Sequence, residues 1–163
     1  MSKRKFIGLC GGLSLEGRQD NSMAVKTLEN DFGFFKTSPL DEISIFAKTI
    51  GMLKDVNTDY EKRIIINKVC ISGMEADRNI WINTALKSVP SDKIAILIDD
   101  VHFKEEAETI KKLGGTLVQI NLPGTEIVKP SFEPDVIIFG NTKEDMLKSF
   151  KLTLHNILDS DNK

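Results

Sequence analysis

Short runs of apolar residues alternate along the chain with longer stretches in which apolar positions recur every three or four residues. The runs predict β-strands at residues 6–10, 34–38, 94–98, 117–122 and 136–140. The periodic stretches predict helices over about 22–32, 39–50, 76–88, 104–113 and 143–158. Apolar strands that alternate with helices predict a mostly parallel central sheet flanked by helices, which is a three-layer α/β fold.

Several boundaries carry their own signals. Asn21 or Ser22 is suited to cap the first helix, and Gly33 is suited to end it. The segment RIIINKVCISG at 63–73 is ambiguous, because its β-branched run favours a strand while its apolar positions also fit a helical period. We expect a single domain over 1–163, with a lid or substrate-binding section around 54–90.

Composition and charge narrow the class of protein. The chain has 163 residues, 40% hydrophobic residues and a net charge of −2, which is typical of a soluble globular protein and argues against a nucleic-acid partner. No signal peptide or membrane-spanning run is present, so we expect a cytoplasmic protein without a membrane partner. Cys10 and Cys70 are expected to be free thiols, and His102 a surface or capping residue.

The first strand leads into a glycine-rich loop, FIGLCGGLSLEGRQDNS, which is followed by a helix. This layout is typical of phosphate cradles, whose usual pattern is GxxxxGK[ST]. One register aligns Gly12 and Gly17 with the two glycines and leaves Arg18 in place of the lysine. A second register, counted back from the helix, aligns Asp20-Asn21-Ser22 with Gly-Lys-Ser. Both registers lack the lysine, and an ordinary strand-to-helix connection is the alternative.

The carboxyl ends of the predicted strands meet at one edge of the sheet, where such folds bind ligands. Asp99 and Asp100 end the most apolar strand, and this arrangement suits a Mg²⁺ site. Paired aspartates also serve as turn and capping residues. The remaining ends are the glycine loop, residues 121–124 and residues 140–141.

A third cluster lies in SGMEADRNIW. Glu75 and Arg78 are three residues apart and would share a helix face, either as an exposed ion pair or with the arginine available for a phosphate. Trp81 is the only tryptophan, and its alternatives are a core residue or a surface for stacking a base.

Taken together and in order, these segments resemble the deoxynucleoside monophosphate kinases of tailed phages, which are P-loop kinases related to adenylate kinase. The matching segments are FIGLCGG, GFFKTSPLDEI, SGMEADRNIWINTAL and VIIFGNTKEDML, and the most specific is IAILIDDVHFKEEAETIKKLGGTLVQI at 94–120. The chain departs from the family at the missing loop lysine, at His102 in place of an arginine, and at Lys104–Glu105 in place of Pro-Asn.

The resemblance implies a P-loop NTPase-like fold with a divergent phosphate loop, and a helix at 63–73. It implies transfer of the γ-phosphoryl group of ATP to a deoxynucleoside monophosphate (dNMP) with Mg²⁺, in the cytoplasm of a bacterial host cell, by a chain that forms homodimers. The residues implied for ATP are Gly11, Gly12, Gly17, Arg18, Asn21 and Ser22. Those implied for Mg²⁺ are Ser22, Asp99 and Asp100, and those implied for the dNMP are Glu75, Arg78 and Trp81.

Arg18, Arg78 and Asp99 are the residues expected to act in catalysis. Phosphoryl transfer depends on positive charge and Mg²⁺ around the transferred group, so the missing lysine leaves a second hypothesis open. In that hypothesis the chain is a degenerate kinase homologue that binds a nucleotide or a protein partner without turnover. A weaker third hypothesis is a kinase acting on a modified base in phage DNA, which the low charge disfavours.

Overall fold

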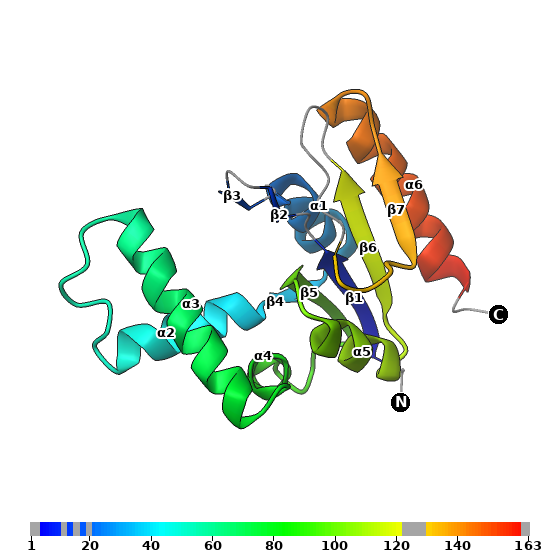
Figure 1. Ribbon diagram of the computed structural model, residues 1–163. Helices are drawn as coiled ribbons and strands as arrows, with labels where there is room; N and C mark the ends of the chain where they lie inside the picture. Colours follow the sequence, from blue (N-terminus) through cyan, green and yellow to red (C-terminus); the bar gives the residue numbers. More distant parts are fainter. Residues whose placement is uncertain (1–3, 11–12, 15–16, 19–20, 122–129, 161–163) are drawn as a thin grey trace.

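The computed structural model describes residues 4–10, 13–14, 17–18, 21–121 and 130–160. Five parallel strands form its central sheet in the order β4-β5-β1-β6-β7 (Figure 1). These strands are β1 Lys5–Cys10, β4 Phe35–Thr37, β5 Ala95–Val101, β6 Thr116–Asn121 and β7 Val136–Phe139. A separate two-stranded antiparallel pair, β2 Leu13–Ser14 and β3 Gly17–Arg18, lies between β1 and the first helix.

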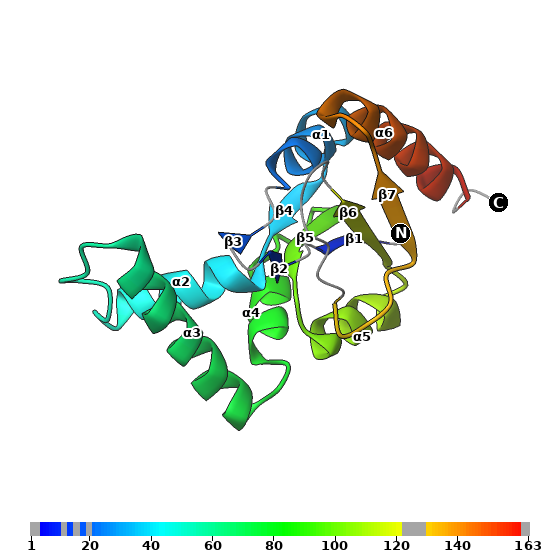
Figure 2. The same cartoon turned by 45° about the horizontal axis from the view of Figure 1, so that its top comes forward.

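Helices cover both faces of the sheet (Figure 2). Helices α1 (Ser22–Phe32) and α6 (Lys143–Ser160) pack on one face, and α4 (Ile80–Ser88) and α5 (Lys104–Lys112) pack on the other. Helices α2 (Pro39–Thr49) and α3 (Asp59–Ala76) extend beyond the β4 edge and pack with α4. The predicted three-layer α/β fold with a parallel central sheet flanked by helices is confirmed.

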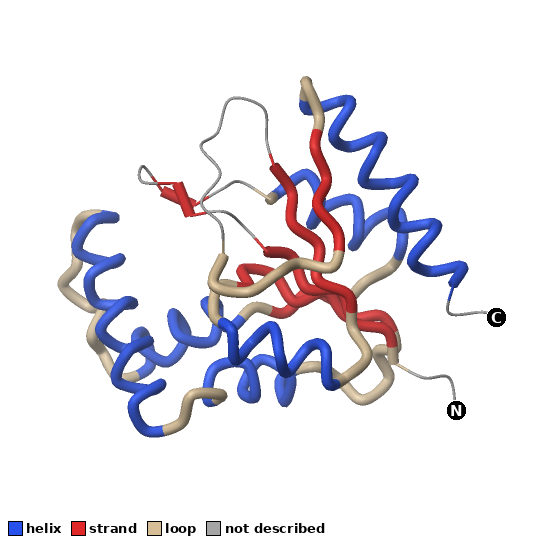
Figure 3. Tube along the Cα trace, turned by 45° about the vertical axis from the view of Figure 1, so that its right-hand side comes forward, coloured by secondary structure: helices blue, strands red, loops and turns tan. Residues whose placement is uncertain are grey.

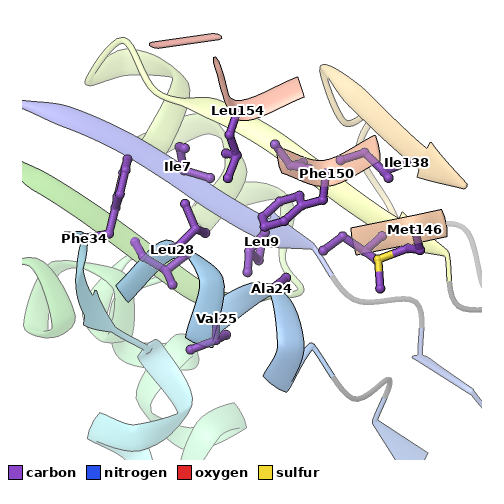
Figure 4. Packing of buried hydrophobic residues seen from close by; sticks show 13 residues of the cluster. Ile7, Leu9, Ala24, Val25, Leu28, Phe34, Ile138, Met146, Phe150 and Leu154 are labelled. Atoms are coloured by element: carbon purple, nitrogen blue, oxygen red, sulfur yellow. The ribbon is translucent and has the colours of Figure 1, made fainter. Parts of the chain in front are cut away.

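The largest buried cluster lies between the sheet and helices α1 and α6 (Figure 4). Phe150 and Leu154 of α6 are fully buried and meet Leu28 of α1 over the strand residues Ile7 and Leu9. A second cluster fills the opposite face under α4 and α5, and a third joins α2, α3 and α4. Figure 3 shows the sheet enclosed between its helical layers, with α2 and α3 to one side. The carboxyl ends of the strands therefore lie at one edge of a sheet that is packed on both faces.

The helix boundaries follow local signals in the sequence. Asn21 stands at the N-cap position of α1, but its side chain makes no capping hydrogen bond. Gly33 ends that helix with a left-handed φ of 68°, as predicted. Ser38 caps α2 by accepting from the backbone N–H groups of Leu40 and Asp41, and Pro39 occupies the first helical turn.

The segment 63–73 is helical, as the resemblance implied, and forms the middle of α3. This helix begins earlier than predicted, at Asp59, because Thr58 and Glu61 form a reciprocal capping box. Residues 59–62 therefore belong to α3.

The helix predicted over 76–88 is present and ends at Ser88 as predicted, but its predicted start at residue 76 is wrong. Helix α3 continues to Ala76, and α4 starts at Ile80. Between them Asp77 is extended, with φ −150° and ψ 115°, and its side chain accepts from the backbone N–H of Asn79 at 2.9 Å. This local hydrogen bond competes with helix continuation. Among the described residues, no helix is both long enough and apolar enough to cross a lipid bilayer.

Candidate functional site

A β-bulge interrupts strand β5 at its carboxyl end. Ile98 pairs with Gly8 and Val101 with Cys10, so β5 has two residues, Asp99 and Asp100, opposite one residue of β1. Asp100 has a φ of 57°, a left-handed conformation that is rare outside glycine, and its backbone N–H donates to Asp99 Oδ1 at 2.9 Å. Bulges and strained residues of this kind concentrate at functional sites, where they re-aim side chains.

Asp99 is a buried carboxyl group, with 8% of its surface exposed. Burial and then the neighbouring charge of Asp100 raise its pKa to about 6, against opposing effects of the Asp100 N–H and the Lys36 ammonium. A carboxyl group that titrates close to neutrality beside a second carboxyl is suited to bind a divalent cation, which would favour the charged form of both.

Lys36 brings positive charge to this edge from the neighbouring strand. Lys36 of β4 pairs in register with Leu97 of β5, so its side chain lies on the face that carries α1 and Asp99. Its Nζ lies 2.9 Å from Asp41 Oδ2 in the first turn of α2. Burial lowers the pKa of Lys36, but the hydrogen bond and charge of Asp41, with Asp99 and Asp100, raise it above its usual value. Lys36 is therefore charged at neutral pH.

Asp100 faces a different set of partners. Its Oδ2 lies 3.5 Å from Ser38 Oγ, and its Oδ1 lies 3.9 Å from His102 Nε2. His102, predicted to be a surface or capping residue, is half-buried, with 19% of its side chain exposed. The cause is the bulge, which ends β5 with Asp100 and His102 close together. Residues from β4, α2 and β5 therefore converge at this edge of the sheet.

Glu106 lies beneath the edge at the start of α5. It is 5% exposed, and its Oε2 accepts from the backbone N–H groups of His102 at 2.8 Å and Phe103 at 3.0 Å. Burial raises its pKa to about 7, because it outweighs the effect of these two hydrogen bonds. The carboxylate thus fixes the turn that leads from Asp100 into α5.

Replacing Glu106 with glutamine is expected to flatten the pH dependence of stability. A raised carboxyl pKa contributes stability below about pH 4.5 that is lost as the pH rises through about 7, whereas glutamine keeps the capping oxygen without the buried charge. Between pH 5 and pH 8 the ionisation of Glu106 is expected to lower the free energy of unfolding of the wild type by about 2–3 kcal/mol, and Glu106→Gln should avoid this loss. Urea unfolding at pH 5 and pH 8 measures it. If Glu106→Gln and the wild type showed the same difference in unfolding free energy between the two pH values, the proposed burial of the charged Glu106 carboxylate would be contradicted. The control is Glu106→Ala, which removes the capping oxygen and should destabilise the protein at both pH values.

The phosphate-loop prediction falls partly outside the described residues, because Gly11 and Gly12 lie there. Gly17 and Arg18 form strand β3, whose backbone pairs Arg18 with Leu13. Asn21 is 8% exposed at the N-terminus of α1, and its Oδ1 is buried without a hydrogen-bond partner in the described part of the chain. Because α1 starts at Ser22, the second register agrees with the helix boundary and aligns Asn21 with the lysine position.

The donor atoms at this edge fit Mg²⁺ and a polyphosphate. Mg²⁺ prefers oxygen ligands and usually takes only one or two carboxylates together with substrate phosphates and water. Asp99 and Asp100 supply the carboxylates, and the unpartnered Asn21 Oδ1 is suited to accept from a metal-bound water. Among the described residues, no group of three or more His, Cys, Asp or Glu side chains is arranged to hold a metal by itself. A metal ion at this edge would therefore need further ligands from water or from a bound molecule.

The expected pairing of Glu75 with Arg78 on one helix face is wrong. Glu75 belongs to the last turn of α3, whereas Arg78 lies in the turn before α4. Arg78 is 73% exposed, and its Nη1 lies 3.4 Å from Glu105 Oε1 at the start of α5. The break at Asp77 separates the two residues, and Arg78 links α4 to α5.

Trp81 is a core residue that also lines a pocket. It is 6% exposed, and its Nε1 donates to the backbone carbonyl of Cys70 at 3.1 Å. A Cβ at Gly73 would lie 2.6 Å from the Trp81 ring, so this glycine allows the ring to pack directly on α3. Phe46 of α2 meets the ring edge-on at 5.8 Å between centroids.

The pocket has a volume of about 670 Å³ between α2, α3 and α4. Its walls are mainly apolar, with Phe46 and Trp81 as aromatic groups and Glu42 and Lys68 as charged ones. Size and lining are those of small-molecule sites. Glu42 lies one turn along α2 from Ser38, which touches Asp100, so the pocket begins about 6 Å along the helix from the sheet edge.

The carboxyl ends of β6 and β7 at this edge make contacts within the protein. Asn121 of β6 is buried, and its Oδ1 accepts from Gln119 Nε2 at 3.0 Å. Gly140 follows β7 against the backbone of Met146 in α6, where a Cβ would clash. Residues 122–129 lie outside the described residues. The two thiols are buried and free, and burial raises the pKa of Cys10 to about 12 and also raises that of Cys70.

Sequence reasoning missed Lys36, Ser38, Asp41 and Glu106 as members of this site. A signal was present for Ser38, because Ser-Pro before two acids is typical of a helix N-terminus. Lys36 sits in a short strand pattern in which a lysine is unremarkable. Only the register of β4 against β5 brings it to Asp99.

No family model matches the sequence, and the search of curated proteins found no match. Among solved structures, the chain is similar to a shikimate kinase from Aquifex aeolicus vf5 at 16% sequence identity and a TM-score of 0.45. That match covers 94% of this chain and 98% of the kinase.

Proposed function

We propose that this chain is a P-loop-type phosphotransferase that moves the γ-phosphoryl group of ATP to a dNMP with Mg²⁺. The observation that carries the proposal is that the bulged pair Asp99–Asp100 and the N-terminus of α1, with its buried Asn21 Oδ1 that is unpartnered among the described residues, lie at the same carboxyl edge of the parallel sheet. A helix N-terminus beside carboxylates at the carboxyl edge of a parallel sheet has the donors that a Mg²⁺–polyphosphate needs.

In this proposal the α1 N-terminus and the glycine loop hold the ATP phosphates, with Gly11, Gly12, Gly17 and Arg18 supplying loop contacts. Ser22 and the β5 aspartates would hold Mg²⁺, which would supply charge neutralisation at the transferred group. The bond from the γ-phosphorus to the β,γ-bridging oxygen breaks as a bond to the acceptor phosphate oxygen forms, so ADP leaves with the bridging oxygen. The acceptor oxygen is already ionised at neutral pH, so no residue has to remove a proton from it.

The acceptor is proposed to lie between the pocket and this edge. Its base would enter the apolar pocket beside Phe46 and Trp81, and its phosphate would point along α2 toward Ser38 and Asp100. The proposed roles of Glu75 and Arg78 in acceptor binding rest on the sequence resemblance, because neither residue lines the pocket.

A second candidate function is nucleotide binding without turnover. The specific observation in its favour is that Asn21, an uncharged residue, aligns with the lysine of the loop in the register that matches the start of α1. Loss of one positive charge at the transferred phosphate weakens the transition state more than the ground state, so binding can outlast catalysis.

ADP formation with Mg–ATP and each dNMP separates these functions. We expect turnover that requires both Mg²⁺ and a dNMP, and that falls in Arg18→Ala if the loop arginine contributes. ATP binding by calorimetry without turnover supports the second candidate. Absence of both binding and turnover contradicts both functions. Arg63→Ala, which changes an exposed arginine of α3 outside the pocket lining, is the matched control.

A further inference from the structure

We propose that Lys36 takes the role of the missing loop lysine, by contacting the phosphate being transferred. This inference rests on the proposed phosphotransferase function and names the cation of that site. It concerns a residue that the loop motif does not include and that lies on a different strand.

The Lys36 side chain lies on the side of the sheet that carries α1 and Asp99. Phe34 packs in the cluster beneath α1, and Phe35 packs in the cluster on the opposite face, so alternation directs Lys36 to the α1 side. Asp99 lies on that same side, two residues beyond Leu97, the register partner of Lys36. Helix α1 packs against both β4 and β5, so α1 and the Lys36 side chain lie on the same side of the sheet.

Lys36 brings positive charge to Asp99. Its ammonium is one of the groups that act on the Asp99 carboxyl, and it lowers the pKa of that carboxyl. Arg78 is engaged with Glu105 near α5. Arg4 donates to the backbone carbonyls of Pro90 and Ser91, which lie before β5 and therefore at the opposite end of the sheet. A polyphosphate entering beside Asp99 would thus meet the Lys36 ammonium.

The Lys36 ammonium is accessible to a bound phosphate. The Lys36 side chain is 29% exposed, and its partner Asp41 is 56% exposed on the first turn of α2. An exposed pair of this kind contributes little net free energy, so the ammonium can exchange Asp41 for a phosphate oxygen at small cost. A flexible four-carbon stem lets it follow the phosphate during that exchange.

Calorimetric binding of Mg–ATP and of adenosine to wild type and Lys36→Met tests the proposal. We expect Lys36→Met to weaken Mg–ATP binding about tenfold or more, with little change for adenosine, because the lost contact is with phosphate. Lys36→Arg should restore most of the affinity. Asp41→Asn, which frees the ammonium, should keep Mg–ATP binding at or above the wild-type level.

Lys151→Met is the matched control, since Lys151 forms a half-exposed pair with Asp31 at 2.7 Å between α6 and α1. The proposal is overturned if Lys36→Met binds Mg–ATP like wild type, or if Asp41→Asn loses as much affinity as Lys36→Met, which would make Lys36 only a counter-ion for Asp41. If wild type binds no Mg–ATP, the phosphotransferase function itself is wrong. Urea unfolding of each variant shows that the fold is retained.

Discussion

Replacing Trp81 with alanine is expected to lower the free energy of unfolding by about 3–5 kcal/mol. The indole is 6% exposed and forms the centre of the cluster that joins α2, α3 and α4. Its removal leaves a cavity that Gly73 cannot fill and also deletes the hydrogen bond to the Cys70 carbonyl. Urea denaturation followed by circular dichroism measures the change.

The control for this prediction is Trp81→Phe, which keeps a ring in the cluster and removes only the donor. We expect it to cost about 1–2 kcal/mol, the sum of one hydrogen bond and a small volume loss. Because the ring also lines the pocket, Trp81→Ala should abolish dNMP binding if the acceptor lies there. A stability loss below about 1 kcal/mol in Trp81→Ala would mean that α2 and α3 can repack without the indole.

Replacing Asp99 with asparagine is expected to reduce phosphoryl transfer by about 100-fold or more while making the protein more stable at neutral pH. The activity loss follows from removing a carboxylate proposed to hold Mg²⁺. The gain in stability follows because the carboxyl is buried with a pKa near 6, so its charge opposes folding above that pH.

The sign of the stability change depends on pH. A carboxyl pKa raised from 3.8 to about 6 contributes stability that is present below pH 3.8 and lost as the pH rises through 6. Asp99→Asn should therefore exceed wild type by about 2–3 kcal/mol at pH 8 and approach it near pH 4. Urea unfolding at the two pH values, beside an ADP-release assay, measures both effects. An equally active variant would remove Asp99 from the proposed mechanism, and a less stable one at pH 8 would contradict its desolvation.

Most of the fold was predictable because its signals are local. IAILI and VIIFG are apolar runs bounded by polar residues, and Gly33 and Ser38 end and begin helices through their own backbone and side-chain preferences. The helix break at Asp77 was missed because Ala76 and Ile80 continue a helical period across it. A local hydrogen bond from the Asn79 backbone to the Asp77 side chain overrides that period.

The site was less predictable because its members meet through tertiary structure. Asp99 and Asp100 were found from the strand end, but the left-handed φ of Asp100 depends on pairing with β1. Lys36 reaches Asp99 only through the register of two strands separated by 58 residues in the sequence, from 37 to 95. The absence of a hydrogen-bond partner for Asn21 Oδ1 among the described residues follows from the packing of α1, which no motif encodes.

The extra residue in β5 also decides which side of the sheet the chain faces after the two aspartates. In an unbroken strand, Val101 would lie on the same side of the sheet as Leu97, which is the side that carries α1 and not the side that carries α5. Instead Val101 packs with Ile98 and Ile110 in the cluster beneath α5. The extra residue therefore reverses the side of the sheet that Val101 faces. As a result, the chain leaves β5 on the side where α5 packs. Deleting Asp100 would therefore remove more than a carboxylate, because it would turn Val101 toward the wrong side of the sheet and oblige α5 to start there.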